Sequence, residues 1–113
     1  MRMSEEGILL ALGYVANDAT IAQLRGILSK CDFETSELDR IVGLNDKLKI
    51  YGAHVAMSNS NPYFKIKNEA TNEERKGAAT EIINAWAEKY RLELQKVAGK
   101  ETYYVLGRQI SKN

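Results

Sequence analysis

The chain has 113 residues, 44% of them hydrophobic and 27% charged, and this composition is ordinary for one folded domain. Its formal net charge of +1 excludes a polybasic protein that binds phosphates through charge alone, and its single cysteine excludes an internal disulfide framework. One cysteine and one histidine are too few for a structural zinc site. We therefore expect a single domain over residues 1–113, with a helical part at 1–57 and a sheet part at 63–108.

An apolar run occupies residues 7–16. As a helix it would rise about 15 Å, roughly half of a bilayer core, so it predicts a buried helix and not a membrane span. Ser4 predicts the start of this helix because a hydroxyl caps free N–H groups, and we expect the helix to run to about Val15. Glu5 and Glu6 stand where a signal peptide would be positive, so we expect a cytoplasmic protein with no membrane partner.

Two further helices are predicted before residue 57. Asn17 supplies the cap of the first, whose apolar residues recur at spacings of three and four on one helix face. Thr35 or Ser36 supplies the cap of the second. Residues 49–57 either extend this last helix or form a strand, and the sequence leaves that choice open.

The last of these helices carries apolar residues at spacings of 3, 4, 3 and 4, which is a heptad stripe over two repeats. A stripe of this length is typical of a helix packed within its own domain. The alternative is a helix-mediated homodimer. Its candidate interface residues are Ile41, Leu44, Leu48, Tyr51 and Val55.

A turn at residues 58–62, which contains the only proline, separates the helical part from the sheet part. The five residues that follow alternate as a strand. Phe64 and Ile66 lie on one face of this strand, and Tyr63, Lys65 and Lys67 lie on the other.

A capping box at residues 71–74 begins a helix that we expect to reach Tyr90. Residues 91–97 and 101–108 then form two strands joined by a turn. The fold class is therefore α+β: about three N-terminal helices followed by a β-α-β-β unit with a small mixed sheet and a right-handed crossover. The second face of this sheet must be covered by the N-terminal helices, a second subunit or a partner.

No catalytic constellation is recognisable. Cys31 and His54 are the only thiol and imidazole, and they fall on or near different predicted elements. The acidic pairs at residues 5–6 and 73–74 are explained by their places at helix starts, and the glycines form no phosphate-binding loop. We expect no enzymatic activity, no cofactor and no metal.

Basic and aromatic residues on the sheet indicate nucleic-acid binding, because such faces stack the bases and screen the phosphates of single strands. The candidate nucleic-acid face comprises Tyr63, Lys65, Lys67, Arg91, Tyr103 and Arg108. A second version of this hypothesis treats the N-terminal half as a winged helix, with residues 49–57 and 63–67 as the wing. Glu37, Asp39 and Asp46 on its recognition helix oppose that version, because they would face phosphates.

Taken together, these features predict a small non-enzymatic protein-interaction or regulatory module. Its partner would be another protein or a second copy of the chain in a homodimer. A nucleic-acid-binding module that uses the basic and aromatic sheet face is the alternative.

Overall fold

The computed structural model describes residues 4–31, 33, 37–58 and 61–108. It confirms the α+β class, with three helices ahead of the first strand and one helix between the second and third strands. No helix among these residues is long and apolar enough to cross a membrane. The elements are α1 (Glu5–Ala11), α2 (Asp18–Cys31), α3 (Leu38–Lys49), β1 (Ala53–Met57), β2 (Phe64–Asn68), α4 (Glu73–Tyr90), β3 (Leu92–Lys96) and β4 (Thr102–Arg108).

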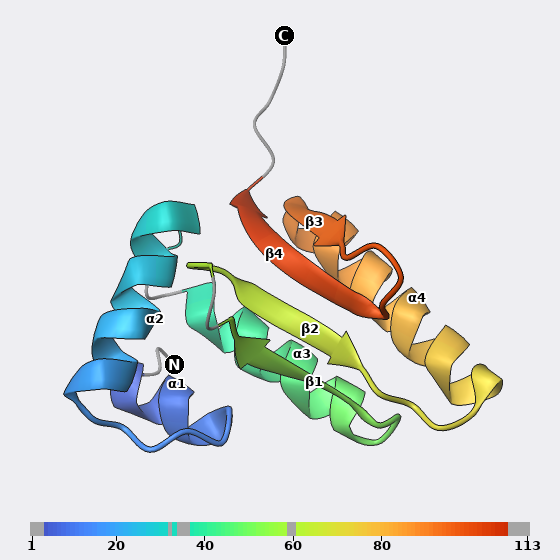
Figure 1. Ribbon diagram of the computed structural model, residues 1–113, viewed down its shortest axis with the longest axis horizontal. Coiled ribbons are helices and arrows are strands. Elements are labelled where there is room, and N and C mark those ends of the chain that lie inside the picture. Colours follow the sequence, from blue (N-terminus) through green and yellow to red (C-terminus); the bar gives the residue numbers. More distant parts are fainter. Residues whose placement is uncertain (1–3, 32, 34–36, 59–60, 109–113) are drawn as a thin grey trace, which may run out of the picture.

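The four strands form one sheet in the order β1-β2-β4-β3, and every hydrogen-bonded pair is antiparallel. The expected mixed sheet is corrected on this point. The strands β2 and β3 do run parallel, as a β-α-β crossover requires, but β4 lies between them and pairs with both (Figure 1). The strand pair β1-β2 was missing from the predicted unit because residues 49–57 were left open between helix and strand.

Helices α3 and α4 lie side by side behind the sheet, while α1 and α2 lie beside it (Figure 1). Every second residue of β1 and β2 is buried beneath this helical layer, which is the period expected of a sheet covered on one face. The main core therefore lies between the sheet and α3 and α4. The opposite face of the sheet has no described helix over it.

Helix α1 begins as predicted, since the Ser4 hydroxyl accepts a hydrogen bond from the Gly7 N–H at 3.0 Å. It ends at Ala11, earlier than predicted, and Gly13 follows with a left-handed φ of 91° that breaks the helical path. The helix is buried on one side only, because Leu10 is 64% exposed.

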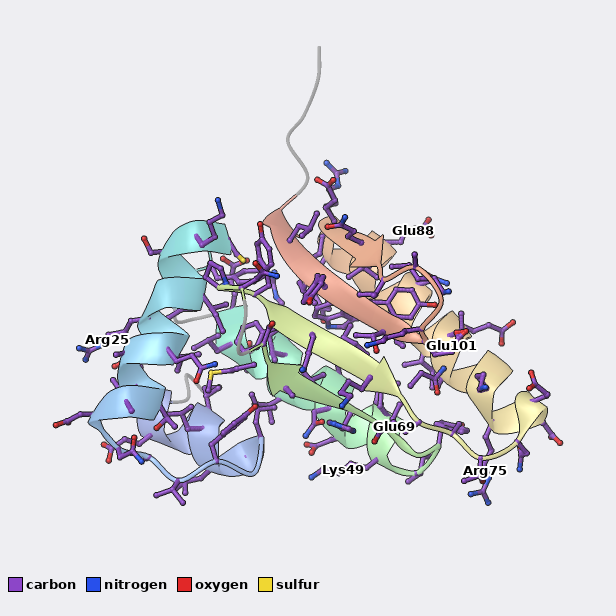
Figure 2. The ribbon with its side chains drawn as sticks, in the orientation of Figure 1. Arg25, Lys49, Glu69, Arg75, Glu88 and Glu101 are labelled. Carbon is purple, nitrogen blue, oxygen red and sulfur yellow. The ribbon has the colours of Figure 1, made fainter. Side chains whose placement is uncertain are left out.

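Helix α2 is joined to α1 by an exposed ion pair. The Arg25 guanidinium bonds the Glu5 carboxylate at 3.0 Å, and this hydrogen bond holds the pKa of Glu5 below its usual value. Arg25 lies on the side of α2 turned away from the sheet (Figure 2). The predicted cap of α2 is confirmed, because the Asn17 side chain accepts from the Thr20 N–H at 2.9 Å.

The segment 49–57 divides between two elements. Helix α3 ends at Lys49, and Ala53–Met57 form β1. Gly52 makes the turn with a φ of 86°, and a Cβ there would lie 3.2 Å from the Ala70 Cα. The predicted caps of α3, Thr35 and Ser36, lie outside the described residues, and the helix begins after Glu37.

The outer edge of β1 is closed by side chains. The Val55 N–H donates to Asn45 Oδ1 at 2.8 Å, and the Met57 N–H donates to the Tyr14 hydroxyl at 2.9 Å. These two groups lie on the edge of β1 that faces away from β2, where another strand could otherwise pair. The N-terminal helices therefore protect one edge of the sheet.

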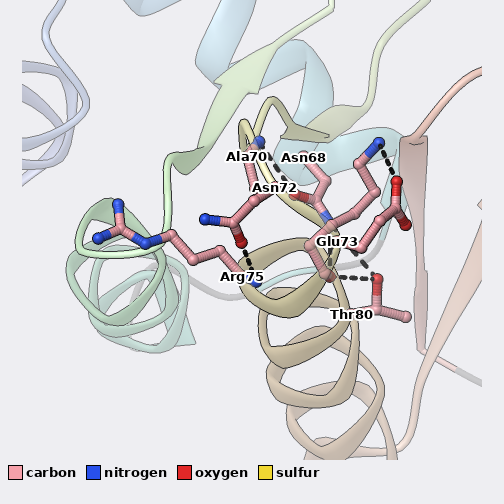
Figure 3. Close-up of polar contacts among 7 residues, drawn as sticks. Asn68, Ala70, Asn72, Glu73, Arg75 and Thr80 are labelled. Carbon is pink, nitrogen blue, oxygen red and sulfur yellow. Dashed lines mark hydrogen bonds and ion pairs between the residues drawn. The ribbon is translucent and has the colours of Figure 1, made fainter.

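Helix α4 begins one residue later than the predicted capping box implies. Asn72, and not Thr71, is the N-cap, and its side chain accepts from the Arg75 N–H at 2.8 Å (Figure 3). Just before it, the buried Asn68 side chain donates to the Lys76 carbonyl at 3.0 Å and ties the end of β2 to this first turn. Asparagine caps a helix at least as well as threonine, so the shift of the cap by one residue does not weaken the start of the helix.

Candidate nucleic-acid interface

The face of the sheet turned away from α3 and α4 is open to solvent (Figure 1). The strand register brings half-buried and exposed side chains of all four strands onto it. We call this surface the open face; its side chains are His54, Ala56, Tyr63, Lys65, Lys67, Gln95, Thr102, Tyr104 and Leu106.

An aromatic pair lies next to a lysine on the open face. The rings of Tyr63 and Tyr104 are 5.9 Å apart between centroids and tilted by 53°. Lys65 is the direct cross-strand partner of Tyr104. Side chains in such positions are neighbours on one face of a sheet, so a cation and two aromatic rings share one small area.

The second row of the open face carries most of the charge. His54 is the cross-strand partner of Lys67, and Thr102 flanks Lys67 on the other side. Glu69 lies 3.7 Å from both His54 Nδ1 and Lys67 Nζ. The His54 and Lys67 side chains are partly exposed and the Glu69 side chain is 58% exposed, so solvent and salt weaken these contacts.

Acidic side chains gather at one end of the sheet. Figure 2 shows Glu69 and Glu101 together where β2 ends and β4 begins. The backbone also joins this end, since the Asn68 N–H donates to the Glu101 carbonyl at 2.9 Å. No ion pair with a described carboxylate engages Lys65, which lies farther along β2. The area around Lys65, Tyr63 and Tyr104 is therefore the more electropositive part of the open face.

The structure brings part of the predicted nucleic-acid face together. Tyr63, Lys65 and Lys67 lie on one side of the sheet as expected. Tyr103 does not join them: it is 7% exposed and lies opposite Ile66 on the face beneath the helices. Its neighbour in the sequence, Tyr104, occupies the open face instead, because successive residues of a strand point to opposite sides.

The other two residues of that predicted face lie at element ends. Arg91 is exposed and caps the C-terminus of α4 in a left-handed conformation with a φ of 54°, so it is not part of the sheet. Arg108 is the last residue of β4, and its side chain lies outside the described part of the chain.

The predicted dimer stripe is part of the chain's own core. Ile41, Leu44 and Leu48 are buried on α3, and Val55 is buried on β1. Tyr51 is partly buried and packs against the same core. The stripe crosses from a helix into a strand, and its side chains are not exposed to a second copy. The side chains of the candidate interface therefore pack within the chain's own core.

The winged-helix version is only partly matched. A β-hairpin, β1-β2, does follow α3, but it forms half of a four-stranded sheet and does not project as a wing. The exposed residues of α3 include ion pairs such as Lys49 with Asp46 at 3.7 Å. Helix α3 therefore presents no continuous basic surface to phosphates.

The two nucleophile candidates face different neighbours. The Cys31 thiol is buried 3.6 Å from the Val105 carbonyl, and burial raises its pKa to about 11. His54 lies on the open face beside Glu69. A thiol in this state is a weak nucleophile, because the thiolate is the reactive form. Among the described residues no group of three or more His, Cys, Asp or Glu side chains could hold a metal ion.

Comparison with known proteins finds no matching family model, curated protein or solved structure. The functional argument therefore starts from the open face itself. Sequence reasoning did not place Tyr104 or His54 on it, and it did not predict the Glu69 carboxylate beside His54. Alternation along β4 separates Tyr104 from Tyr103 but does not say which of them faces the helices, and His54 and Glu69 meet only through the pairing of β1 with β2.

Proposed function

We propose that this protein is a non-enzymatic nucleic-acid-binding module, which acts in the cytoplasm and binds single strands on the open face of its sheet. The observation that carries the proposal is the pair of tyrosines, Tyr63 and Tyr104, with Lys65 directly beside them on an exposed face. Aromatic rings on a sheet stack unpaired bases, and neighbouring cations screen the phosphates between those bases.

The geometry favours a single strand over a duplex. In a duplex the base faces are already stacked, so Tyr104 would have nothing to stack against. The lysines of β2, Lys65 and Lys67, lie two residues apart on the same side and follow the strand direction. A single-stranded nucleic acid that lies across β2 and β4 would place its phosphates along the two lysines and its bases over the two tyrosines.

The first test is fluorescence anisotropy with labelled mixed-sequence single- and double-stranded oligonucleotides, at about 50 and 200 mM salt. Two phosphate contacts predict a slope of about −1.4 in log K against log salt for a single strand, or about a sevenfold loss of affinity over this range. We expect the duplex to bind more weakly than the single strand at both salt concentrations. Equal affinities, or affinity that salt leaves unchanged, would contradict the proposal.

Amino-acid substitutions then test whether the open face is the surface that binds the nucleic acid. Lys65→Glu with Lys67→Glu should abolish binding, whereas the matched double change Lys30→Glu with Lys89→Glu alters two exposed lysines on α2 and α4 and should leave most of it. The change Tyr104→Ala should weaken single-strand binding by about 1–3 kcal/mol, the usual size of one base–aromatic stack.

The carboxylate of Glu69 supplies a test in the opposite direction. It lies 3.7 Å from both His54 and Lys67, where it competes with phosphate for the Lys67 ammonium. We therefore expect Glu69→Gln to tighten binding by about two- to fivefold at low salt, and less at high salt, because exposed pairs are screened. A binding protein that used another surface would not respond to this change.

A further inference from the structure

A groove of about 330 Å³ runs between α3 and α4, on the other side of the sheet from the open face. Its apolar lining comes mainly from Ile82 and Ala85 on α4, because Leu44 on α3 is only 1% exposed. Gly43 widens it, because a Cβ at that position would meet nothing within 4 Å. A volume of this size is at the lower end of what small-molecule sites offer.

One end of the groove is aromatic. Trp86 and Tyr90 meet edge to face, with ring centroids 6.2 Å apart. The Trp86 ring is fixed, since its Nε1–H donates to the Arg40 carbonyl at 3.1 Å. The Arg40 guanidinium lies 4.5 Å from the centre of the Tyr90 ring. The aromatic end is therefore held in place by contacts between the two helices.

Three positively charged side chains line the groove. Arg40 and Lys47 line it from α3, and Lys89 lines it from α4, against one lining carboxylate, Asp39. Arg40 is already paired with Glu37 at 3.3 Å. No described carboxylate forms an ion pair with Lys47 or Lys89. Lys89 Nζ lies 5.3 Å from the centre of the Tyr90 ring, in a cation–π contact. The groove thus offers two ammonium groups, of which Lys47 has no described partner, beside an aromatic end.

We propose that the α3–α4 groove is a binding site for a small organic anion that carries an aromatic ring, such as an arylcarboxylate. The ring would lie on the apolar surface against Trp86 and Tyr90, and the carboxylate would meet Lys47 and Lys89. A cation of the same shape is disfavoured by three positive side chains. This site is independent of the nucleic-acid proposal, because it uses none of the open-face residues.

The chain contains one tryptophan, so the emission of Trp86 reports on this groove directly. Titration of the full chain with phenylacetate, excited where only tryptophan absorbs, should give a saturable change with a Kd of about 0.1–1 mM. Benzylamine has the same ring with a cationic group, and acetate has the same anion without the ring. Each should bind at least tenfold more weakly than phenylacetate.

Two variants locate the site. Gly43→Leu fills the groove from an exposed helical position where glycine disfavours the helix, so this variant should fold and lose binding at least tenfold. The double change Lys47→Gln with Lys89→Gln should weaken phenylacetate at least fivefold and leave benzylamine no weaker. Lys30→Gln on α2 is the matched control and should bind as the original chain does.

Amide chemical-shift changes provide a second readout that does not depend on tryptophan. With phenylacetate they should concentrate on α3 and α4 and leave His54, Lys65 and Tyr104 unmoved. Binding of benzylamine as tight as that of phenylacetate, or phenylacetate binding that survives Gly43→Leu in a folded chain, would overturn the proposal.

Discussion

Asn45 and Tyr14 make hydrogen bonds that a fifth strand would otherwise make. Asn45 is 3% exposed, and its Oδ1 is the acceptor for the Val55 N–H. Tyr14 accepts from the Met57 N–H two residues farther along the same edge. A buried N–H without an acceptor costs more free energy than an average hydrogen bond gains. The Asn45 bond is buried and the Tyr14 bond is part-buried, so Asn45 should contribute more to stability.

We expect Asn45→Leu to lower the free energy of unfolding by about 1–3 kcal/mol, because it leaves the Val55 N–H buried without an acceptor. Tyr14→Phe should cost about 1 kcal/mol or less, since that edge position is nearer to solvent. Urea unfolding followed by circular dichroism measures both. Equal and negligible losses would show that the edge of β1 needs no side-chain cover.

The Cys31 thiol makes stability depend on alkaline pH. Burial raises its pKa from 9.0 to about 11, so the folded chain keeps a proton that the unfolded chain releases. Its contribution is complete below about pH 9 and is lost as the pH rises to about 11. We expect the stability of Cys31→Ala to fall less steeply than that of the original chain between these values. Urea midpoints at pH 8, 9, 10 and 11 test this, and parallel curves for the two proteins would refute it.

At the scale of elements, the N-cap of α4 distinguishes the contributions of two neighbouring residues, Asn72 and Thr71, to helix stability. Asn72 holds the Arg75 N–H, while the neighbouring Thr71 lies one position before the cap. We expect Asn72→Ala to cost about 1 kcal/mol and Thr71→Ala to cost much less. Thermal unfolding of the two variants decides between them. A larger loss of stability for Thr71→Ala than for Asn72→Ala would instead support the capping box that the sequence predicts.

The elements most accurately predicted are those with strong local periodicity. Alternation assigned both faces of residues 63–67, and the helix expected after residues 71–74 does reach Tyr90 as α4. The stripe at residues 41–55 packs in the chain's own core, but it divides between two elements, because Val55 lies on β1 and not on α3. Periodicity alone does not report where Gly52 turns the chain.

The faces of β4 required information that local sequence does not hold. Alternation separates Tyr103 from Tyr104, but both faces carry large side chains, so either tyrosine could face solvent. The choice is made by register, which places Tyr103 against Ile66 beneath the helices. The α3–α4 groove was out of reach for the same reason, because Arg40 and Trp86 are distant in sequence and meet only after packing.

The whole molecule has one core, and the buried stripe belongs to it. Leu48 is fully buried in the apolar core, so Leu48→Asp would bury a carboxylate there and lower the free energy of unfolding by several kcal/mol. We therefore expect global unfolding, seen as loss of helical circular dichroism and early elution in size-exclusion chromatography. A folded monomer derived from a dimeric parent would instead support the interface that the stripe suggests.

The position of β4 has a consequence for how the chain is made. The strand lies between β2 and β3, yet it comes after both of them in the sequence. Before β4 is synthesised, the nascent chain can hold the β1-β2 hairpin and the α4-β3 segment, joined by the contacts of α4 with α3 and β2 but with no strand between β2 and β3. The inner edges of β2 and β3 are both unpaired during that interval, and unpaired edges invite pairing with other chains. Release of β4 therefore closes the sheet in one step, and the cell's chaperones have their main opportunity to bind just before it.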